Sequence, residues 1–352
     1  MTGDRISRPS DFIVPRSAFL QWLNALRREF LVSGPVTEAG NTSFRDISAA
    51  DELDFSYVST MLPPGKLYLY EPLQNMFSIS LNGEGKISEV RPDPAIRVLV
   101  GVHACDTHAI LYLDKTFLGA FRDPYYEARR RNTLIISLNC NSVGPNCFCS
   151  SMGTGPFLGV ENGYDMLITG IEDDFLAEVR TERMIRLFSF PEARKAGPGD
   201  FRKKEEKEQD LRAKFRKEIR IENLSGLLIG NPDHPVWRRT AQDLCLSCSN
   251  CVMVCPTCFC YDVVDEISMD MKSVRRFRQW DACQDAKFAE VHGGNFRSRR
   301  SARLRQFVTH KLDQTHQYGV FGTVGCGRCI TWCPTGIDLT EMAKEVQKSE
   351  SS

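Results

Sequence analysis

Fourteen cysteines are the residues of this 352-residue chain best able to do chemistry, and half of them form two short runs near its C-terminal end. The first run has the spacing C-x2-C-x2-C-x3-C-P and consists of Cys245, Cys248, Cys251 and Cys255. The second has the spacing C-x2-C-x3-C-P and consists of Cys326, Cys329 and Cys333. In bacterial ferredoxins three thiolates on such a turn grip one [4Fe-4S] cluster, and the cysteine before the proline binds the other cluster. The spacing therefore predicts two clusters.

The exchange of the last cysteine of each run defines two ligand sets. The first predicted set is Cys245, Cys248, Cys251 and Cys333. The second predicted set is Cys255, Cys326 and Cys329. Zinc is the alternative metal, but zinc modules usually separate two C-x2-C pairs by roughly 12 to 20 residues. Two compact runs that each end in Cys-Pro favour iron–sulfur clusters.

The second set lacks a fourth thiolate, because Thr323 occupies the position where a cysteine is expected. A spare cysteine can supply the thiolate, a [3Fe-4S] cluster can form instead, or the Thr323 hydroxyl can bind, although oxygen is a poor ligand for thiophilic iron. We favour a spare cysteine. We prefer Cys283 to Cys258 and Cys260 as this ligand, because the adjacent Cys255-Pro256 constrains the latter two. Each of the three can instead be a small buried hydrophobic residue.

Four further cysteines follow two apolar segments of the N-terminal half: Cys105, Cys140, Cys147 and Cys149. Residues 96–102 and 133–139 are predicted to be buried strands. If they are parallel neighbours, their carboxyl ends open onto one crevice. A helix N-terminus beside Cys105 would stabilise a thiolate there. These cysteines can carry a third [4Fe-4S] cluster, and a structural zinc site or buried free thiols are the alternatives.

The elements that must position these cysteines are predicted from periodicity and turn residues. Residues 16–31 and a segment starting near Asp106, the expected N-cap, have the apolar spacing of helices. Hairpins are expected in residues 75–90, turning at Asn82-Gly83, and in residues 155–171, turning at Asn162-Gly163. Residues 202–222 carry many charges of mixed sign and are expected to form a solvated helix that borders two domains.

Composition bounds the class of protein. Lys+Arg and Asp+Glu are both 45, so the balance of charge favours neither nucleic acid nor an acidic membrane as a partner. No secretory signal and no apolar run of about 18 residues is visible, which predicts a cytoplasmic protein without a membrane span. Thiols stay reduced in the cytosol, so fourteen cysteines indicate metal binding better than disulfides. The arginine-rich residues 297–311 form either a solvated helical face or a surface that docks an acidic partner.

The predicted fold class is α+β, with two domains joined by a linker. Residues 1–200 are expected to form a mixed α/β domain with a four-cysteine cluster site. Residues 201–229 are the charged helical linker. Residues 230–352 are expected to form a mostly helical dicluster domain of the bacterial ferredoxin type.

An ordered series of short motifs resembles a known family: "HACDTHAI", "DPYYEARR", "CFCSSMGTGP", "HPVW", "CLSCSNCVMVCPTCFC", "WDAC" and "GCGRCITWCPTGIDLTE". The series is similar to the β subunit of cytosolic sulfhydrogenases, which are NADP-linked nickel–iron hydrogenases, and to the related A subunit of anaerobic sulfite reductases. The resemblance covers residues 60 to 345 approximately. At Thr323 the chain departs from the family, which usually has cysteine there.

The resemblance implies an electron-transfer subunit with several [4Fe-4S] clusters. Such a subunit passes electrons between a flavin-containing subunit that uses NAD(P)H and a catalytic subunit, which can be a hydrogenase, a sulfite reductase or a heterodisulfide-type reductase. Cys105, Cys140, Cys147 and Cys149 match the family's N-terminal cysteines, which implies a third cluster.

Two other functions remain as alternatives. The chain can be a reductase whose cluster near Thr323 binds a small substrate, or a zinc-stabilised interaction or nucleic-acid protein that uses its arginines from 297 to 305. The sequence shows no acid–base constellation, so no catalytic residue is predicted.

Overall fold

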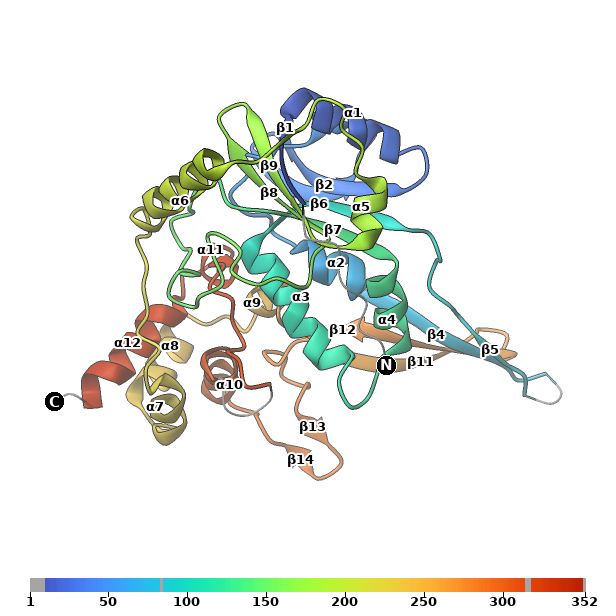
Figure 1. The fold of residues 1–352 in the computed structure, drawn as a ribbon. Helices are drawn as coiled ribbons and strands as arrows, with labels where there is room; N and C mark the ends of the chain where they lie inside the picture. The colour runs from blue at the N-terminus through green and yellow to red at the C-terminus, as the bar shows by residue number, and fades with distance from the viewer. Residues whose placement is uncertain (1–9, 83–84, 314–317, 351–352) are drawn as a thin grey trace.

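A twisted eight-stranded sheet forms the centre of the N-terminal half (Figure 1). The computed structural model describes residues 10–82, 85–313 and 318–350. The strand order is β10-β1-β9-β8-β7-β6-β2-β3. The strands of this sheet, in chain order, are β1 (Ser10–Pro15), β2 (Leu31–Glu38), β3 (Asn41–Asp46), β6 (Arg97–His103), β7 (Thr133–Leu138), β8 (Met166–Ile171), β9 (Asp174–Val179) and β10 (Arg194–Lys195).

The middle of this sheet is parallel and covered on both faces. Strand β7 pairs parallel with β6 and with β8, which confirms that the two predicted apolar strands are parallel neighbours. Every residue of β7 is buried. Helices α1 (Arg16–Leu26) and α5 (Glu182–Leu187) lie on one side, and α2 (Pro64–Leu69), α3 (Ala104–Phe117) and α4 (Pro124–Arg131) lie on the other (Figure 1). Helices on both faces explain why these strands are continuously apolar.

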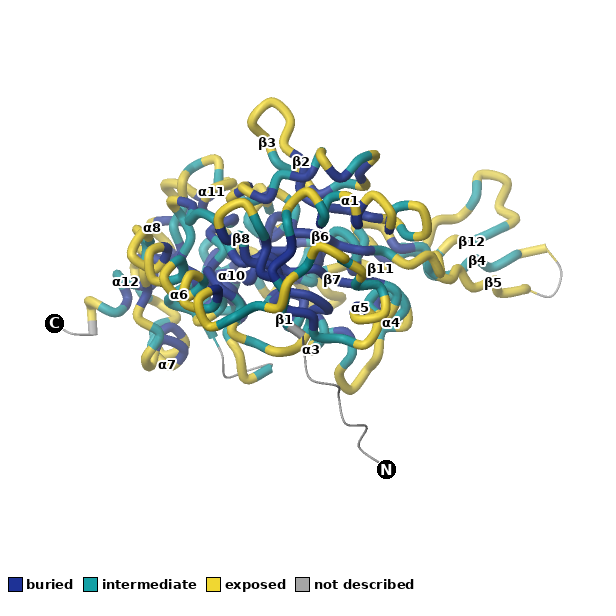
Figure 2. Tube along the Cα trace, turned by 45° about the horizontal axis from the view of Figure 1, so that its top comes forward, coloured by how far each residue is buried: buried dark blue, intermediate teal, exposed yellow. Residues whose placement is uncertain are grey.

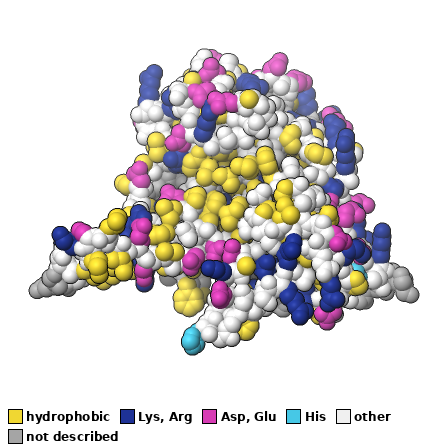
Figure 3. Space-filling model, turned by 180° about the vertical axis from the view of Figure 1, so that it is seen from behind, with side chains coloured by type: hydrophobic (Ala, Val, Ile, Leu, Met, Phe, Trp, Pro, Cys, Tyr) yellow, Lys and Arg dark blue, Asp and Glu magenta, His cyan; other side chains and the backbone are white. Residues whose placement is uncertain are grey.

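A second sheet projects from the molecule and combines strands from both halves of the chain. Its order is β11-β12-β4-β5. Its strands are β4 (Leu73–Ser80), β5 (Ile87–Glu89), β11 (Tyr261–Ile267) and β12 (Ser273–Trp280). Figure 2 shows that this extension is largely exposed, whereas the parallel strands form the buried centre. Hydrophobic side chains are visible on it from behind (Figure 3), and Ile87, Ile267 and Met269 are among the exposed ones.

The C-terminal part of the chain consists of helices, loops and the paired strands β11 and β12. The helices are α6 (Pro198–Arg212), α7 (Leu224–Gly230), α8 (Pro235–Asp243), α9 (Asn250–Met253), α10 (Arg300–Leu312), α11 (Arg328–Thr331) and α12 (Leu339–Glu350). A short hairpin joins β13 (Glu290–Val291) to β14 (Gly294–Asn295), and a 3-10 turn, η1, spans Ala50–Glu52. The chain thus contains helices and a large mixed sheet. A mostly helical C-terminal module is not confirmed, because β11 and β12 form a long ribbon within it.

Several expected boundaries differ from the structure. The hairpin expected in residues 155–171 is wrong, because β8 turns into β9 at Glu172 and Asp173. The charged helix ends at Arg212, and it packs on the sheet through Lys204, which pairs with the buried Glu178 of β9. The strands β4 and β5 pair as expected, but Gly83 lies outside the described residues. No helix among the described ranges is long and apolar enough to cross a membrane.

Candidate iron–sulfur site

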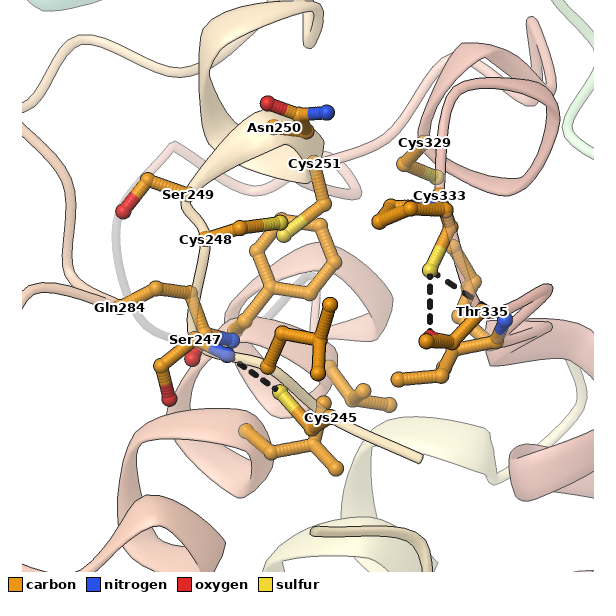
Figure 4. A pocket seen from close by; sticks show the side chains of 17 residues that line it. Cys245, Ser247, Cys248, Ser249, Asn250, Cys251, Gln284, Cys329, Cys333 and Thr335 are labelled. Carbon is orange, nitrogen blue, oxygen red and sulfur yellow. Dashed lines mark hydrogen bonds between the residues drawn. The ribbon is translucent and has the colours of Figure 1, made fainter. Parts of the chain in front are cut away.

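The thiols of the first predicted set line one cavity (Figure 4). Cys245 and Cys248 lie on the loop that leads into α9, Cys251 lies in the first turn of α9, and Cys333 comes from the loop after α11. Ser247 and Ser249, between these cysteines, have positive φ angles of 52° and 67°, which curl the loop around the cavity. Leu304, Phe307 and Val308 of α10 close its apolar side. The sequence-predicted residues are therefore brought together.

Backbone N–H groups point at two of these sulfurs. The N–H of Ser247 donates to the Cys245 Sγ at 3.4 Å, and the N–H of Ile337 donates to the Cys333 Sγ at 3.3 Å. Hydrogen bonds to sulfur are one of the means by which a protein sets the potential of an iron–sulfur cluster. The cavity is lined by the four predicted thiols, by Cys329 of the second set and by apolar side chains, and this donor set fits such a cluster. Cys248 is exposed to solvent.

The second predicted set combines Cys255 of the first run with Cys326 and Cys329 of the second run. Burial raises the pKa of Cys329 well above its ordinary value, and the nearby sulfurs of Cys255 and Cys326 raise it further. Burial likewise raises the pKa of Cys326 to about 11. Neighbouring thiolates in an apolar interior repel one another, so their negative charge needs a bound cation. The mutual proximity of Cys255, Cys326 and Cys329 therefore fits the predicted set.

The Thr323 hydroxyl takes part in a hydrogen bond with the backbone. Its Oγ1 accepts a hydrogen bond from the N–H of Gly325 at 3.2 Å. Thr323 also lines a cavity of about 470 Å³, together with His108 and Tyr112 of α3.

The three spare cysteines divide between two contacts. Cys258 adjoins Cys255, because its backbone N–H donates to the Cys255 carbonyl at 3.4 Å. Cys283 lies near Cys260 and near Cys251 of the first set. Among the described residues, Cys258 is the one of the three that has a backbone hydrogen bond to a member of the second set.

The N-terminal cysteines gather at the carboxyl ends of β6 and β7, as expected. Cys105 lies in the first turn of α3, and Cys140 follows β7 by two residues. Burial raises the pKa of Cys140 to about 12, and the sulfur of Cys147 adds to this effect. Cys149 is influenced by both Cys140 and Cys147. The four side chains thus lie close to one another.

The loop that carries Cys147 and Cys149 contacts the second ferredoxin-type run. The N–H of Phe148 donates to the Gly325 carbonyl at 2.8 Å, and the Cys147 thiol lies 3.8 Å from the Cys326 carbonyl oxygen. The nearby Cys326 sulfur raises the pKa of both Cys105 and Cys149. No three His, Cys, Asp or Glu side chains in the described ranges are arranged to hold a single metal ion.

A buried ion pair fixes the same junction. Both guanidinium nitrogens of Arg328 donate to the Asp106 carboxylate at 2.7 Å, and both side chains are 1% exposed. The Arg328 Nε also donates to the Thr60 carbonyl at 2.8 Å. Asp106 therefore anchors the second run to α3 instead of capping this helix, whose N-cap is His103.

Two buried lysines flank the second set. Burial alone lowers the pKa of Lys311, but the Cys255 and Cys258 thiolates outweigh it and raise this pKa well above its ordinary value. The Lys66 ammonium donates to the carbonyls of Val252 and Met253 at 3.0 and 3.1 Å and lies 4.3 Å from the centre of the Trp280 ring. Sequence reasoning missed Lys66 and counted Lys311 only among the basic residues 297–311, because neither lysine has a spacing that relates it to the cysteines.

The arginine-rich segment, residues 297–311, has a structural role that the sequence did not suggest. Arg300 donates to the Cys245 carbonyl at 2.7 Å. Arg303 is buried and donates to the carbonyls of Arg297 and Ser298. These arginines hold the loops around the first set, so the segment is more than a solvated face.

Comparisons with known proteins agree with this geometry. Residues 244–337 match a family described as a 4Fe-4S dicluster domain. The chain is 34% identical over 337 residues to the sulfhydrogenase 2 subunit beta of Pyrococcus furiosus, which covers 94% of this chain and 96% of the relative. No solved structure matches.

Proposed function

This chain belongs to the family of the sulfhydrogenase β subunits, and from that premise we propose that it relays single electrons between a flavin-containing subunit that uses NAD(P)H and a separate catalytic subunit. Its class is that of an iron–sulfur electron-transfer subunit of a hydrogenase-type complex. The identity of the two neighbours and a cytoplasmic location are the finer parts of the proposal.

One observation carries the proposal: the cysteine sets form a continuous series. Cys326 contacts Cys147 of the N-terminal set on one side and lies close to Cys255 and Cys329 on the other. Cys251 of the first set is in turn close to Cys255. A series of adjacent sets supports electron transfer from one end of the chain to the other.

The residues of the chain supply binding and tuning. Bound clusters would provide the one-electron redox chemistry, and their potentials depend on hydrogen bonds to sulfur and on solvent exposure. Ser247 and Ile337 provide such hydrogen bonds, and the buried lysines provide positive charge. The exposed Cys248 brings one end of the series to the surface, where a partner can approach.

We further propose a third cluster, held by Cys105, Cys140, Cys147 and Cys149. Four neighbouring thiols at the carboxyl ends of parallel strands support it. The exposed apolar side chains of the projecting sheet support association with other subunits, since such patches mark interaction sites.

The test is the amount of iron, acid-labile sulfide and zinc per chain in anaerobically purified protein. We expect about twelve irons and about twelve sulfides, four of each for every [4Fe-4S] cluster. About eight irons with one zinc would make the N-terminal site structural. Zinc without iron would overturn the proposal as a whole.

A second candidate is a reductase with its own substrate site. The cavity of about 470 Å³ beside Thr323 favours it, because it offers room next to the second set. Reduction of a small substrate by this chain alone, with an artificial electron donor, would support this candidate. Activity that requires the catalytic partner would support the relay.

A further inference from the structure

We propose that Cys258 supplies the fourth thiolate of the second cluster, in the place of the cysteine that Thr323 replaces, and that Lys311 balances the charge of this set. The inference rests on the proposed function, because it assumes that Cys255, Cys326 and Cys329 bind a cluster.

The turn that follows Cys255 brings Cys258 back beside it. The N–H of Cys258 donates to the Cys255 carbonyl at 3.4 Å, so the two residues adjoin each other in one tight turn. The side chains of Cys255 and Cys258 are 6% and 3% exposed. Pro256 lies inside this turn and does not prevent it, which removes the reason for ranking Cys258 behind Cys283. The pair has the C-x2-C spacing with which two thiolates commonly grip one cluster.

The alternatives to Cys258 are engaged elsewhere. The Thr323 hydroxyl accepts a hydrogen bond from the Gly325 N–H and, as a neutral oxygen, is a poor ligand for thiophilic iron. The cavity that Thr323 lines has no cysteine among its described lining residues. Cys283 lies near Cys260, near Lys311 and near Cys251, which belongs to the first set. The geometry therefore favours Cys258 over the residue that the sequence suggested.

Lys311 gives an independent reason for negative charge at this place. Its ammonium is 2% exposed and donates to the Thr257 hydroxyl at 3.0 Å and to the Gly322 carbonyl at 2.9 Å. Among the described residues, it has no carboxylate within ion-pair distance. A buried ammonium is costly unless an opposite charge compensates it. Cys255 and Cys258, which adjoin it, provide this charge once they are thiolates bound to iron.

The experiment compares Cys258→Ala with Cys283→Ala in the full chain, purified anaerobically. Alanine is chosen because a serine oxygen can itself bind iron. We expect Cys258→Ala to lose about one iron per chain and to show the EPR signal of an oxidised [3Fe-4S] cluster, since a corner without thiolate readily loses its iron. The wild type and Cys283→Ala are expected to show no such signal. Four-iron occupancy retained in Cys258→Ala, or the three-iron signal appearing in Cys283→Ala or in the wild type, would overturn the assignment.

A rescue variant separates a lost ligand from a misfolded chain. In Cys258→Ala/Thr323→Cys a thiolate returns at the other position, so we expect the iron content to recover and the three-iron signal to disappear. If Cys258→Ala loses all its clusters and the double variant does not regain them, Cys258 is structural and the assignment fails. Wild-type protein without iron would instead refute the proposed function.

Discussion

At the scale of single residues, burial of charge is the most informative feature of this protein. Lys66 and Lys311 are each 2% exposed, and their ammonium groups are bonded to carbonyl and hydroxyl oxygens. Neutral oxygens satisfy hydrogen bonds but do not neutralise charge. Both lysines lie near Cys255 and Cys258. The charge of these sulfurs outweighs burial at Lys311, whose pKa is raised, whereas burial outweighs it at Lys66, whose pKa is lowered.

Removal of the Lys311 charge is expected to make the second cluster harder to reduce. A unit charge about 4 Å away interacts by about 4 kcal/mol at an effective dielectric constant of about 20, and about 1.4 kcal/mol corresponds to about 59 mV in a one-electron couple. We therefore expect Lys311→Met to lower one midpoint potential by an amount on the order of 100 mV, measured by an EPR-monitored redox titration. Lys272→Met, at an exposed lysine of the projecting sheet, is the control. An unchanged or raised potential in Lys311→Met would contradict the charge argument.

At the scale of elements, two loops from opposite ends of the chain pass within contact distance. Gly325 and Gly327 have φ angles of 63° and 73° and lie against residues of the N-terminal cysteine loop. A side-chain carbon on Gly327 would lie 2.2 Å from the Asn146 carbonyl oxygen. Glycine is therefore required both by the backbone conformation and by the close approach. The Arg328–Asp106 pair holds the same junction from its other side.

Gly327→Ala is expected to push these loops apart and to weaken cluster binding at the junction. Overpacking of this kind costs roughly 1–3 kcal/mol, so we expect clusters to be lost about tenfold faster on warming or chelation. The measurement is the decay of the iron–sulfur absorbance together with the iron content. Gly336→Ala is a matched control, because Gly336 also has a positive φ of 71° but nothing lies within 4 Å of the added carbon. Equal effects in both variants would show that backbone strain alone is responsible.

At the scale of the whole molecule, the sheet and the C-terminal helices place three cysteine sets in succession. The N-terminal set lies at the carboxyl ends of β6 and β7, and the first set lines a cavity against α10. Cys326 and its neighbours lie between them. A relay needs such an order, because electrons pass between redox centres that are close together.

The order predicts magnetic coupling between neighbouring clusters. We expect the EPR spectrum of the fully reduced protein to be broadened by spin–spin interaction, and Cys140→Ala to lose the N-terminal contribution together with about four irons. The remaining clusters should still be reduced by an artificial donor. A spectrum that is a simple sum of isolated clusters in the wild type would contradict the succession of sites.

Some features followed from local sequence because their causes are local. The spacing of Cys245, Cys248 and Cys251 fits a single turn, and apolar runs such as residues 133–139 have only one good environment, a covered parallel sheet. The hairpin turn was misplaced because Asn162-Gly163 is a strong turn signal, whereas the structure turns at Glu172, whose φ is 54°. Local signals of similar strength compete, and pairing with β9 decides between them.

The sequence by itself determined the class of the chemistry, an iron–sulfur protein rich in cysteine, and it predicted which cysteines of the two runs belong together. Only the tertiary structure decided which other groups meet them. Lys66 bonds to a carbonyl 186 residues away, and Arg328 pairs with Asp106 across 222 residues. Such contacts have no spacing to read, because the fold of the sheet and the path of the loops bring them together. For the same reason the choice of Cys258 over Cys283 depends on a turn and its neighbours, and not on the number of residues between cysteines.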